Sequence, residues 1–272
     1  PERAQEGSRI HRKLQKAGGE WYRAEVYLKT SVPYGDFVFT VEGRADGVVE
    51  TGRGFMIDEI KTTSLPIEMI DEDYEAAHWG QAMTYAYLYA KDNSLGEMEV
   101  QLTYYQIDTG QIKRFQRRFS FAQLELFFAD LLKQYHFWAK LRADWQGIRN
   151  QSIQSLAFPF EHYREGQRGL AAAVYRTVRD SGRLFCQAPT GIGKTMSTLY
   201  PAIKAMGEGE GERIFYLTAK TITRQAAEEA FALMRGKGLR VKTITLTAKD
   251  KICFLEQRDC NPETCPYANG YF

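Results

Sequence analysis

Eight residues in the second half of the chain, APTGIGKT at positions 188–195, constrain its fold more than any other segment. A short apolar segment precedes them and a helical pattern follows, so the glycines lie between a strand and a helix. Gly191 and Gly193 allow backbone N–H groups to surround phosphates at the N-terminus of that helix. Lys194 would supply charge to the β- and γ-phosphates, and the Thr195 hydroxyl would bind Mg²⁺. The segment therefore predicts a binding site for a nucleoside triphosphate.

The residues on either side of this loop alternate between strand and helix patterns. Strands are expected at residues 184–187, 214–218 and 241–246, and helices at residues 194–206 and 222–234. Such alternation is typical of a parallel sheet with crossover helices. A polar stretch at residues 147–155, without strong periodicity, precedes this region and marks a domain boundary. The predicted domains are residues 1–147 and residues 148–272.

The first of these domains has the pattern of a mixed α/β fold. Strands are expected at residues 24–28, 37–49, 55–61, 100–107 and 112–119, and helices at residues 75–90 and 121–145. Glycine-containing turns at residues 52–54 and 108–110 join two pairs of these strands into hairpins. Asp71 or Asp73 could cap the first helix.

Two acidic residues and a lysine on the first hairpin are candidates for metal-dependent chemistry. Alternation places Glu59 and Lys61 on one face of their strand, and the partner strand can bring Asp46 beside Glu59. Two converging carboxylates bind hard divalent cations such as Mg²⁺ or Mn²⁺. A nearby lysine can orient attacking water and stabilise a charged transition state. The pattern predicts a metal-assisted hydrolytic site.

Further residues extend this pattern in chain order: Gly7 with His11, GRAD at residues 43–46, EIK at residues 59–61, and Gln81 with Tyr85. Glu25 matches a weaker acidic position. The set resembles the PD-(D/E)XK nuclease superfamily, in particular its RecB-type branch, although Glu59 stands where Asp is commoner. The resemblance implies a restriction-endonuclease-like mixed-sheet core that cleaves DNA. It implies His11, Asp46 and Glu59 as ligands of Mg²⁺ or Mn²⁺, Asp46, Glu59 and Lys61 as catalytic groups, and Gln81 and Tyr85 as contacts to DNA.

The phosphate loop has neighbours that narrow its class. Arg164 and Gln167 precede it, and Thr218 and Gln225 follow it. This arrangement resembles the superfamily 2 helicases of the XPD and DinG type, whose RecA-like motor hydrolyses ATP to move along DNA. The resemblance implies that Thr218 and Gln225 contact the DNA strand. It implies that ATP is bound by Arg164, Gln167, Thr190, Gly191, Gly193, Lys194 and Thr195.

Three cysteines, Cys253, Cys260 and Cys265, lie close together near the end of the chain. Their spacing suits either Zn²⁺ or an iron–sulfur cluster, and a reducing cytosol argues against disulfides. The helicase resemblance favours a [4Fe–4S] cluster, because helicases of that type insert a cluster domain at this point. Cys186 is poorly placed as a fourth ligand, so the missing thiolate is expected beyond Phe272.

Composition sets only wide limits on these interpretations. Hydrophobic residues make up 44% of the chain, enough for packed cores, and a net charge of +2 neither requires nor excludes a nucleic-acid partner. No signal peptide and no membrane-spanning segment is recognisable in the sequence, so a cytoplasmic location is expected.

The combined expectation is a fragment of an ATP-dependent DNA helicase, cut within an iron–sulfur insertion and fused to a metal-dependent nuclease. Its DNA would be single-stranded or branched. No acidic segment that could complete the ATPase site is recognisable after Lys194, so the fragment alone is not expected to unwind DNA. The alternative is a non-catalytic, nuclease-like DNA platform on a P-loop ATPase with a zinc-binding insertion.

Overall fold

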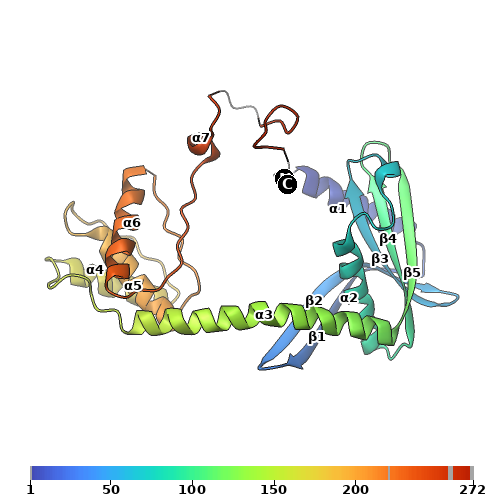
Figure 1. The fold of residues 1–272 in the computed structure, drawn as a ribbon, viewed down its shortest axis with the longest axis horizontal. Helices are drawn as coiled ribbons and strands as arrows, with labels where there is room; N and C mark the ends of the chain where they lie inside the picture. Colours follow the sequence, from blue (N-terminus) through green and yellow to red (C-terminus); the bar gives the residue numbers. More distant parts are fainter. Residues whose placement is uncertain (1, 220, 257–259, 270–272) are drawn as a thin grey trace. The chain divides into compact units, whose positions relative to one another are not determined.

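The computed structural model describes residues 2–219, 221–256 and 260–269. The chain divides into two compact units, Pro1–Arg142 and Ala143–Phe272. Figure 1 labels the helices and strands of both units along the chain. Among the helices described, none combines the length and the apolar character that a bilayer crossing requires.

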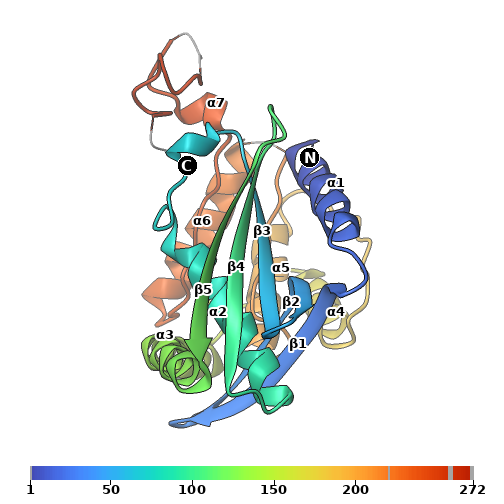
Figure 2. The same cartoon turned by 90° about the vertical axis from the view of Figure 1, so that its right-hand side faces the viewer.

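The first unit is built on a mixed five-stranded sheet, seen in Figure 2. The strands are β1 (Tyr22–Tyr34), β2 (Phe37–Thr51), β3 (Gly54–Thr63), β4 (Glu97–Gln106) and β5 (Ile112–Ser120), in the order β1-β2-β3-β4-β5. Neighbours are antiparallel except β3 and β4, which are parallel. A parallel pair needs a crossover, and helix α2 (Ala76–Asp92) supplies it. The predicted strands, hairpins and mixed α/β class are confirmed.

Two helices lie against opposite faces of the sheet. Helix α2 packs on the face that carries Ile57 and Leu102, where Ala82 and Ala86 are fully buried. Helix α1 (Glu2–Ala17), which the strand and helix patterns did not predict, contacts β1, β2 and β3. Its C-terminal end helps to line a cavity of about 240 Å³ over Asp58, on the other face. Because side chains alternate along a strand, Glu59 belongs to the α2 face.

The predicted cap of α2 was wrong. Glu75 is the N-cap residue, and its carboxylate accepts a hydrogen bond from the Ala77 amide at 3.1 Å. Asp71 instead accepts from the Asp73 amide at 3.1 Å. The two aspartates therefore stabilise the turn before the helix rather than its first turn.

Helix α3 (Phe121–Gln154) continues through most of the polar stretch at residues 147–155 that was expected to be an irregular boundary. The reason is burial at its far end. Ile153 is 1% exposed in the core of the second unit, and a Cβ atom added to Gly207 would lie 2.4 Å from it. Tertiary packing thus stabilises helix where the local sequence shows little periodicity.

The second unit is described as helices joined by irregular segments. They are α4 (Gln167–Arg179), α5 (Lys194–Gly207), α6 (Thr221–Gly236) and the short α7 (Lys249–Ile252). Leu199, Ile203 and Met234 are buried in a core shared with the end of α3. The predicted helices at residues 194–206 and 222–234 are confirmed.

The predicted parallel sheet of the second unit is not formed among the residues that the structure describes. Segments 184–187, 214–218 and 241–246 take part in no strand pairing, and Phe185 and Leu217 are 96% and 89% exposed. Segments 214–218 and 241–246 instead line a groove of about 610 Å³ together with side chains from α5 and α6. Strand pairing needs backbones about 4.8 Å apart, and these two segments form no such pair in the described ranges.

Candidate active site

Asp46 and Glu59 come together at the point where β2 and β3 separate. The ladder between these strands ends at the pair Gly47–Asp58, so each acidic residue lies one position past it. The amide of Ile60, which has no β2 carbonyl opposite it, donates to Oδ2 of Asp46 at 2.8 Å. A side chain thus replaces the missing ladder partner, and this contact fixes the Asp46 carboxylate beside β3.

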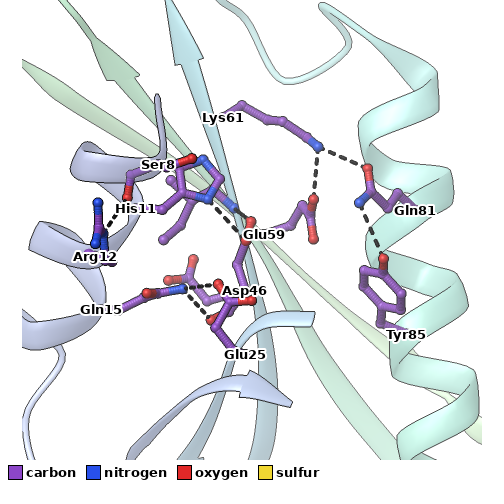
Figure 3. A network of polar contacts seen from close by, with 12 residues as sticks. Ser8, His11, Arg12, Gln15, Glu25, Asp46, Glu59, Lys61, Gln81 and Tyr85 are labelled. Carbon is purple, nitrogen blue, oxygen red and sulfur yellow. Dashed lines mark hydrogen bonds and ion pairs between the residues drawn. The ribbon is translucent and has the colours of Figure 1, made fainter. Parts of the chain in front are cut away.

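Lys61 connects the acidic pair to helix α2, as Figure 3 shows. Its Nζ donates to Oε1 of Glu59 at 2.8 Å and to Oε1 of Gln81 at 2.9 Å. Gln81 in turn donates to the Tyr85 hydroxyl at 3.4 Å. Because residues four apart share a helix face, Gln81 and Tyr85 both face Lys61 and β2. The structure therefore brings these predicted residues together.

Gly43 allows strand β2 to approach Tyr85. A Cβ atom at this position would lie only 2.7 Å from the Tyr85 hydroxyl oxygen. Any side chain here would therefore displace the tyrosine or the strand. This close contact gives the first residue of the GRAD segment a physical role.

Helix α1 closes the other side of the site (Figure 3). Nδ1 of His11 lies 3.0 Å from Oδ1 of Asp46. One turn later, Nε2 of Gln15 donates to Oε1 of Glu25 at 2.9 Å and to the Asp46 carbonyl oxygen at 3.0 Å. Glu25 has a left-handed backbone with φ of 55° and lies opposite Asp46, where the β1–β2 pairing skips a step. The sequence patterns did not identify Gln15, although its i, i+4 spacing from His11 could have done so.

Charge is poorly compensated in this site. Glu59 is 2% exposed, and its Oε2 is buried without a hydrogen-bond partner among the residues that the structure describes. Burial, followed by repulsion from Asp46, raises the pKa of Glu59 to about 7, despite opposing effects of Lys61 and His11. The hydrogen bond to Asp46 raises the pKa of His11 against the effect of burial. Both shifts are expected where ionisable groups are partly buried and lie close to a carboxylate.

These residues suit a divalent cation chemically. A buried carboxylate oxygen without a partner, next to a second carboxylate, lacks the positive charge that a hard cation provides. In the described part of the chain no three His, Cys, Asp or Glu side chains already surround one point closely enough to hold a metal. At this site Nδ1 of His11 is hydrogen-bonded to Asp46.

The predicted phosphate loop, residues 188–195, turns at two glycines just before a helix. Gly191 and Gly193 have φ values of 89° and 81°, the left-handed region that glycine tolerates, and Lys194 begins helix α5. Nζ of Lys194 donates to the carbonyl oxygens of Ala188 and Pro189 at 3.0 and 2.9 Å. The lysine therefore lies over its own loop. Thr190 is exposed and Thr195 is in the first turn of α5.

Arg164 and Gln167 both contact this loop. The Arg164 guanidinium donates to the carbonyl oxygen of Gly191. Gln167 is 2% exposed, accepts from the Arg164 amide at 3.0 Å, and lies so close to Gly193 that a Cβ there would be 2.5 Å from its Nε2. The structure thus joins the upstream pair to the loop. Their contact with a nucleotide stays a prediction.

Thr218 and Gln225 are not brought together in the same way. Thr218 lies in an extended segment that lines the groove of the second unit, whereas Gln225 lies on α6 and donates to Glu229 at 3.0 Å. No hydrogen bond joins the two within the residues described. A shared contact with DNA stays a prediction.

The predicted cluster ligands are not gathered in the structure. Cys253 is partly exposed, Cys260 is exposed and Cys265 is buried, and all three are free thiols. They form no metal-binding group in the described ranges, with or without a neighbouring His, Asp or Glu. Cys265 lies in a local turn, where its amide donates a hydrogen bond to the carbonyl oxygen of Asn261 at 2.8 Å. Neither the iron–sulfur nor the zinc prediction is supported.

Comparison with known proteins agrees with the geometry of the first unit. A family model of the PD-(D/E)XK nuclease superfamily matches residues 2–269. No curated protein matches the chain. Among solved structures, the crystal structure of SSO0001 is similar at 20% sequence identity and a TM-score of 0.34, covering 47% of this chain and 58% of that one. The chain thus spans a little over half the length of that protein.

The superfamily match has two chemical consequences. Nucleases of this superfamily generally use Mg²⁺ or Mn²⁺, and their substrate is DNA. The arrangement of Asp46, Glu59 and Lys61 at the end of the β2–β3 ladder agrees with the use of a divalent cation. The chain belongs to the PD-(D/E)XK nuclease superfamily.

Proposed function

We propose that residues 1–147 form a nuclease domain that cleaves DNA phosphodiester bonds with Mg²⁺ or Mn²⁺. The observation that carries the proposal is the buried Glu59 carboxylate, with one oxygen hydrogen-bonded to Lys61 and the other without a partner in the described part of the chain. Such a group is costly in a folded protein unless something compensates its charge. A divalent cation shared with Asp46 would do so.

The three proposed metal ligands are Asp46, Glu59 and His11. A cation held there would supply the positive charge that polarises a phosphodiester group. Asp46 is already placed by the Ile60 amide and Glu59 by Lys61. The protein therefore orients both carboxylates before any cation binds, which lowers the cost of assembling the site.

Lys61 is the proposed catalytic cation of the chain itself. Its Nζ is fixed between Glu59 and Gln81, and its side chain is 22% exposed, so it remains accessible to substrate. From this position it can orient a water molecule and stabilise negative charge that develops on the phosphate. Gln81 and Tyr85 follow on the same face of α2 and are proposed to position the DNA strand.

A cleavage assay with Mn²⁺ tests this proposal on labelled single-stranded and branched DNA. Lys61→Ala should lower the cleavage rate about 100- to 1,000-fold, the usual effect of removing one transition-state donor. Lys29→Ala is the matched control. Lys29 is on β1 and forms an exposed ion pair with Glu42 on β2, at 3.2 Å. Equal rates for wild type and Lys61→Ala would reject the catalytic role and favour a non-catalytic DNA platform.

We also propose that residues 148–272 bind ATP as part of a helicase motor that moves along DNA. The support is the contact of Arg164 and Gln167 with the glycines of the phosphate loop. Buried Gln167 fills the space next to Gly193, where the loop turns into α5.

Binding of a fluorescent ATP analogue with Mg²⁺ tests the second proposal. Lys194→Ala should weaken binding by about tenfold or more, because the lysine is a charged contact to phosphate. Lys237→Ala, an exposed lysine just after α6, is the control. If ATP binding and DNA binding belong to one motor, each must change the affinity for the other by the same factor. Unchanged ATP affinity in Lys194→Ala would reject the site.

A further inference from the structure

Helix α2 carries a third polar residue in line with Gln81 and Tyr85. His78 precedes Gln81 by three residues and Tyr85 by seven, so the three side chains form one stripe along the helix. Two members of this stripe already belong to the candidate active site, through Lys61. His78 is partly exposed.

The sheet places His78 beside the lysine end of the site. Nδ1 of His78 lies 2.8 Å from the hydroxyl of Tyr104 on β4. Tyr104 is the register partner of Lys61 across the parallel β3–β4 pair, and register partners project to the same face of a sheet. His78, Tyr104 and Lys61 therefore occupy neighbouring positions on the face that α2 covers.

The hydrogen bond to Tyr104 determines which nitrogen of His78 carries the proton. Tyr104 is 2% exposed, so its O–H group needs an acceptor. Within the described residues, Nδ1 of His78 is its hydrogen-bond partner. A Tyr104 hydroxyl that donates to Nδ1 requires the ring proton to be on Nε2. Burial, followed by the charge of Lys61, lowers the pKa of His78 against the effect of Glu75.

We propose that the Nε2–H group of His78 donates a hydrogen bond to a phosphate oxygen of the DNA strand held by Gln81 and Tyr85. Nε2 is on the ring edge opposite Tyr104 and has no hydrogen-bond partner in the part of the chain that the structure describes. A fixed neutral donor next to a lysine suits an anionic phosphate, and backbone contacts of this kind set the register of a nucleic acid. The inference rests on the proposed nuclease function and adds a substrate contact to it.

Binding of a fluorescein-labelled single-stranded oligonucleotide in EDTA, followed by anisotropy, measures this contact without cleavage. His78→Ala should weaken binding by about tenfold, as expected for a hydrogen bond to a charged group. His78→Gln keeps an N–H donor and should recover part of the affinity. His162→Ala, an exposed histidine of the second unit, is the control. Cleavage kinetics with Mn²⁺ should then show a raised KM and a nearly unchanged kcat.

A second measurement separates this role from a structural one. Nitrogen NMR of the imidazole should show the Nε2–H tautomer of His78 in the wild type, and Tyr104→Phe should give a mixture of tautomers with weaker DNA binding. Wild-type affinity in His78→Ala, equal loss in the glutamine and alanine variants, or an Nδ1–H tautomer in the wild type would each overturn the inference. Failure of the wild type to bind or cleave DNA would instead reject the nuclease proposal itself, and this contact with it.

Discussion

The buried Glu59 carboxylate should make the first unit less stable as the pH rises from 4.5 to about 7. Glu59→Gln should remove this pH dependence. The pKa of Glu59 is raised from 4.5 to about 7. Between these pH values the unfolded chain has lost the Glu59 proton while the folded chain retains it. The free energy of unfolding therefore falls as the pH rises.

The size of the effect follows from the same two values. At about 1.4 kcal/mol for each pH unit, the ionised side chain costs the folded state about 3 kcal/mol above pH 7. Glutamine is neutral and retains an oxygen that can accept from Lys61, as Oε1 does now. Glu59→Gln should therefore match the wild type near pH 4.5 and exceed its stability by about 3 kcal/mol near pH 8.5.

Urea unfolding followed by tryptophan fluorescence measures this difference, since Trp79 is buried in the first core. Glu125→Gln, at an exposed position of α3, is the matched control and should stay within about 0.5 kcal/mol of the wild type. Adding Mn²⁺ at pH 8.5 should stabilise the wild type but not Glu59→Gln, because only the former keeps the acidic pair. A stability difference that does not change with pH would refute the reasoning.

Three further substitutions test other parts of the structure. Asp58→Ala should lower the free energy of unfolding by about 3 kcal/mol in urea, because it removes an acceptor of two buried donors, Gln101 and Thr103, and of the half-buried Tyr22 hydroxyl. Gly43→Ala should weaken oligonucleotide binding by about tenfold with the fold retained, as measured by anisotropy and circular dichroism, because its Cβ collides with Tyr85. Ile153→Ala should destabilise the second unit by about 2–5 kcal/mol in urea, through the cavity that it leaves against α5.

The sequence predicted the strands of the first unit well because its pattern there has a single explanation. Strand β5 alternates between half-buried and exposed residues along its whole length, and β-branched and aromatic residues fill β2 and β3. Alternation of this kind indicates a strand with one buried face. Helix α1 was missed because its mean hydropathy is low and few of its side chains are buried.

The second unit was harder to predict because apolar segments do not by themselves specify strand partners. Residues such as Phe185 and Ile244 have high β-propensity, yet both are more than 80% exposed and unpaired. Strand stability depends on a neighbouring backbone, which no local pattern reports. At the end of α3 the sequence instead predicted too little regular structure. Burial of Ile153 stabilises the helix beyond residue 145, where the local sequence pattern ended.

Some site residues could be predicted from local sequence patterns, and others could not. Asp46, Glu59 and Lys61 could be chosen from strand alternation, because a hairpin brings its own two strands together. His78 could not, because its position depends on the parallel register between Lys61 on β3 and Tyr104 on β4. Residues 64–96, 33 in all, separate these strands in the sequence, roughly the length of a crossover unit, and register over such a distance has no short-range signal.

The end of the β2–β3 ladder explains why the two carboxylates differ. Asp46 uses both oxygens within the protein, Oδ2 for the Ile60 amide and Oδ1 for His11. Glu59 uses one and leaves Oε2 without a partner. A cation bound at this point would therefore meet an open oxygen on Glu59, but at Asp46 it would replace the hydrogen bond to His11, which is itself a proposed ligand. Helix α1 need not move in that exchange, because Gln15 also holds it to the Asp46 carbonyl and to Glu25.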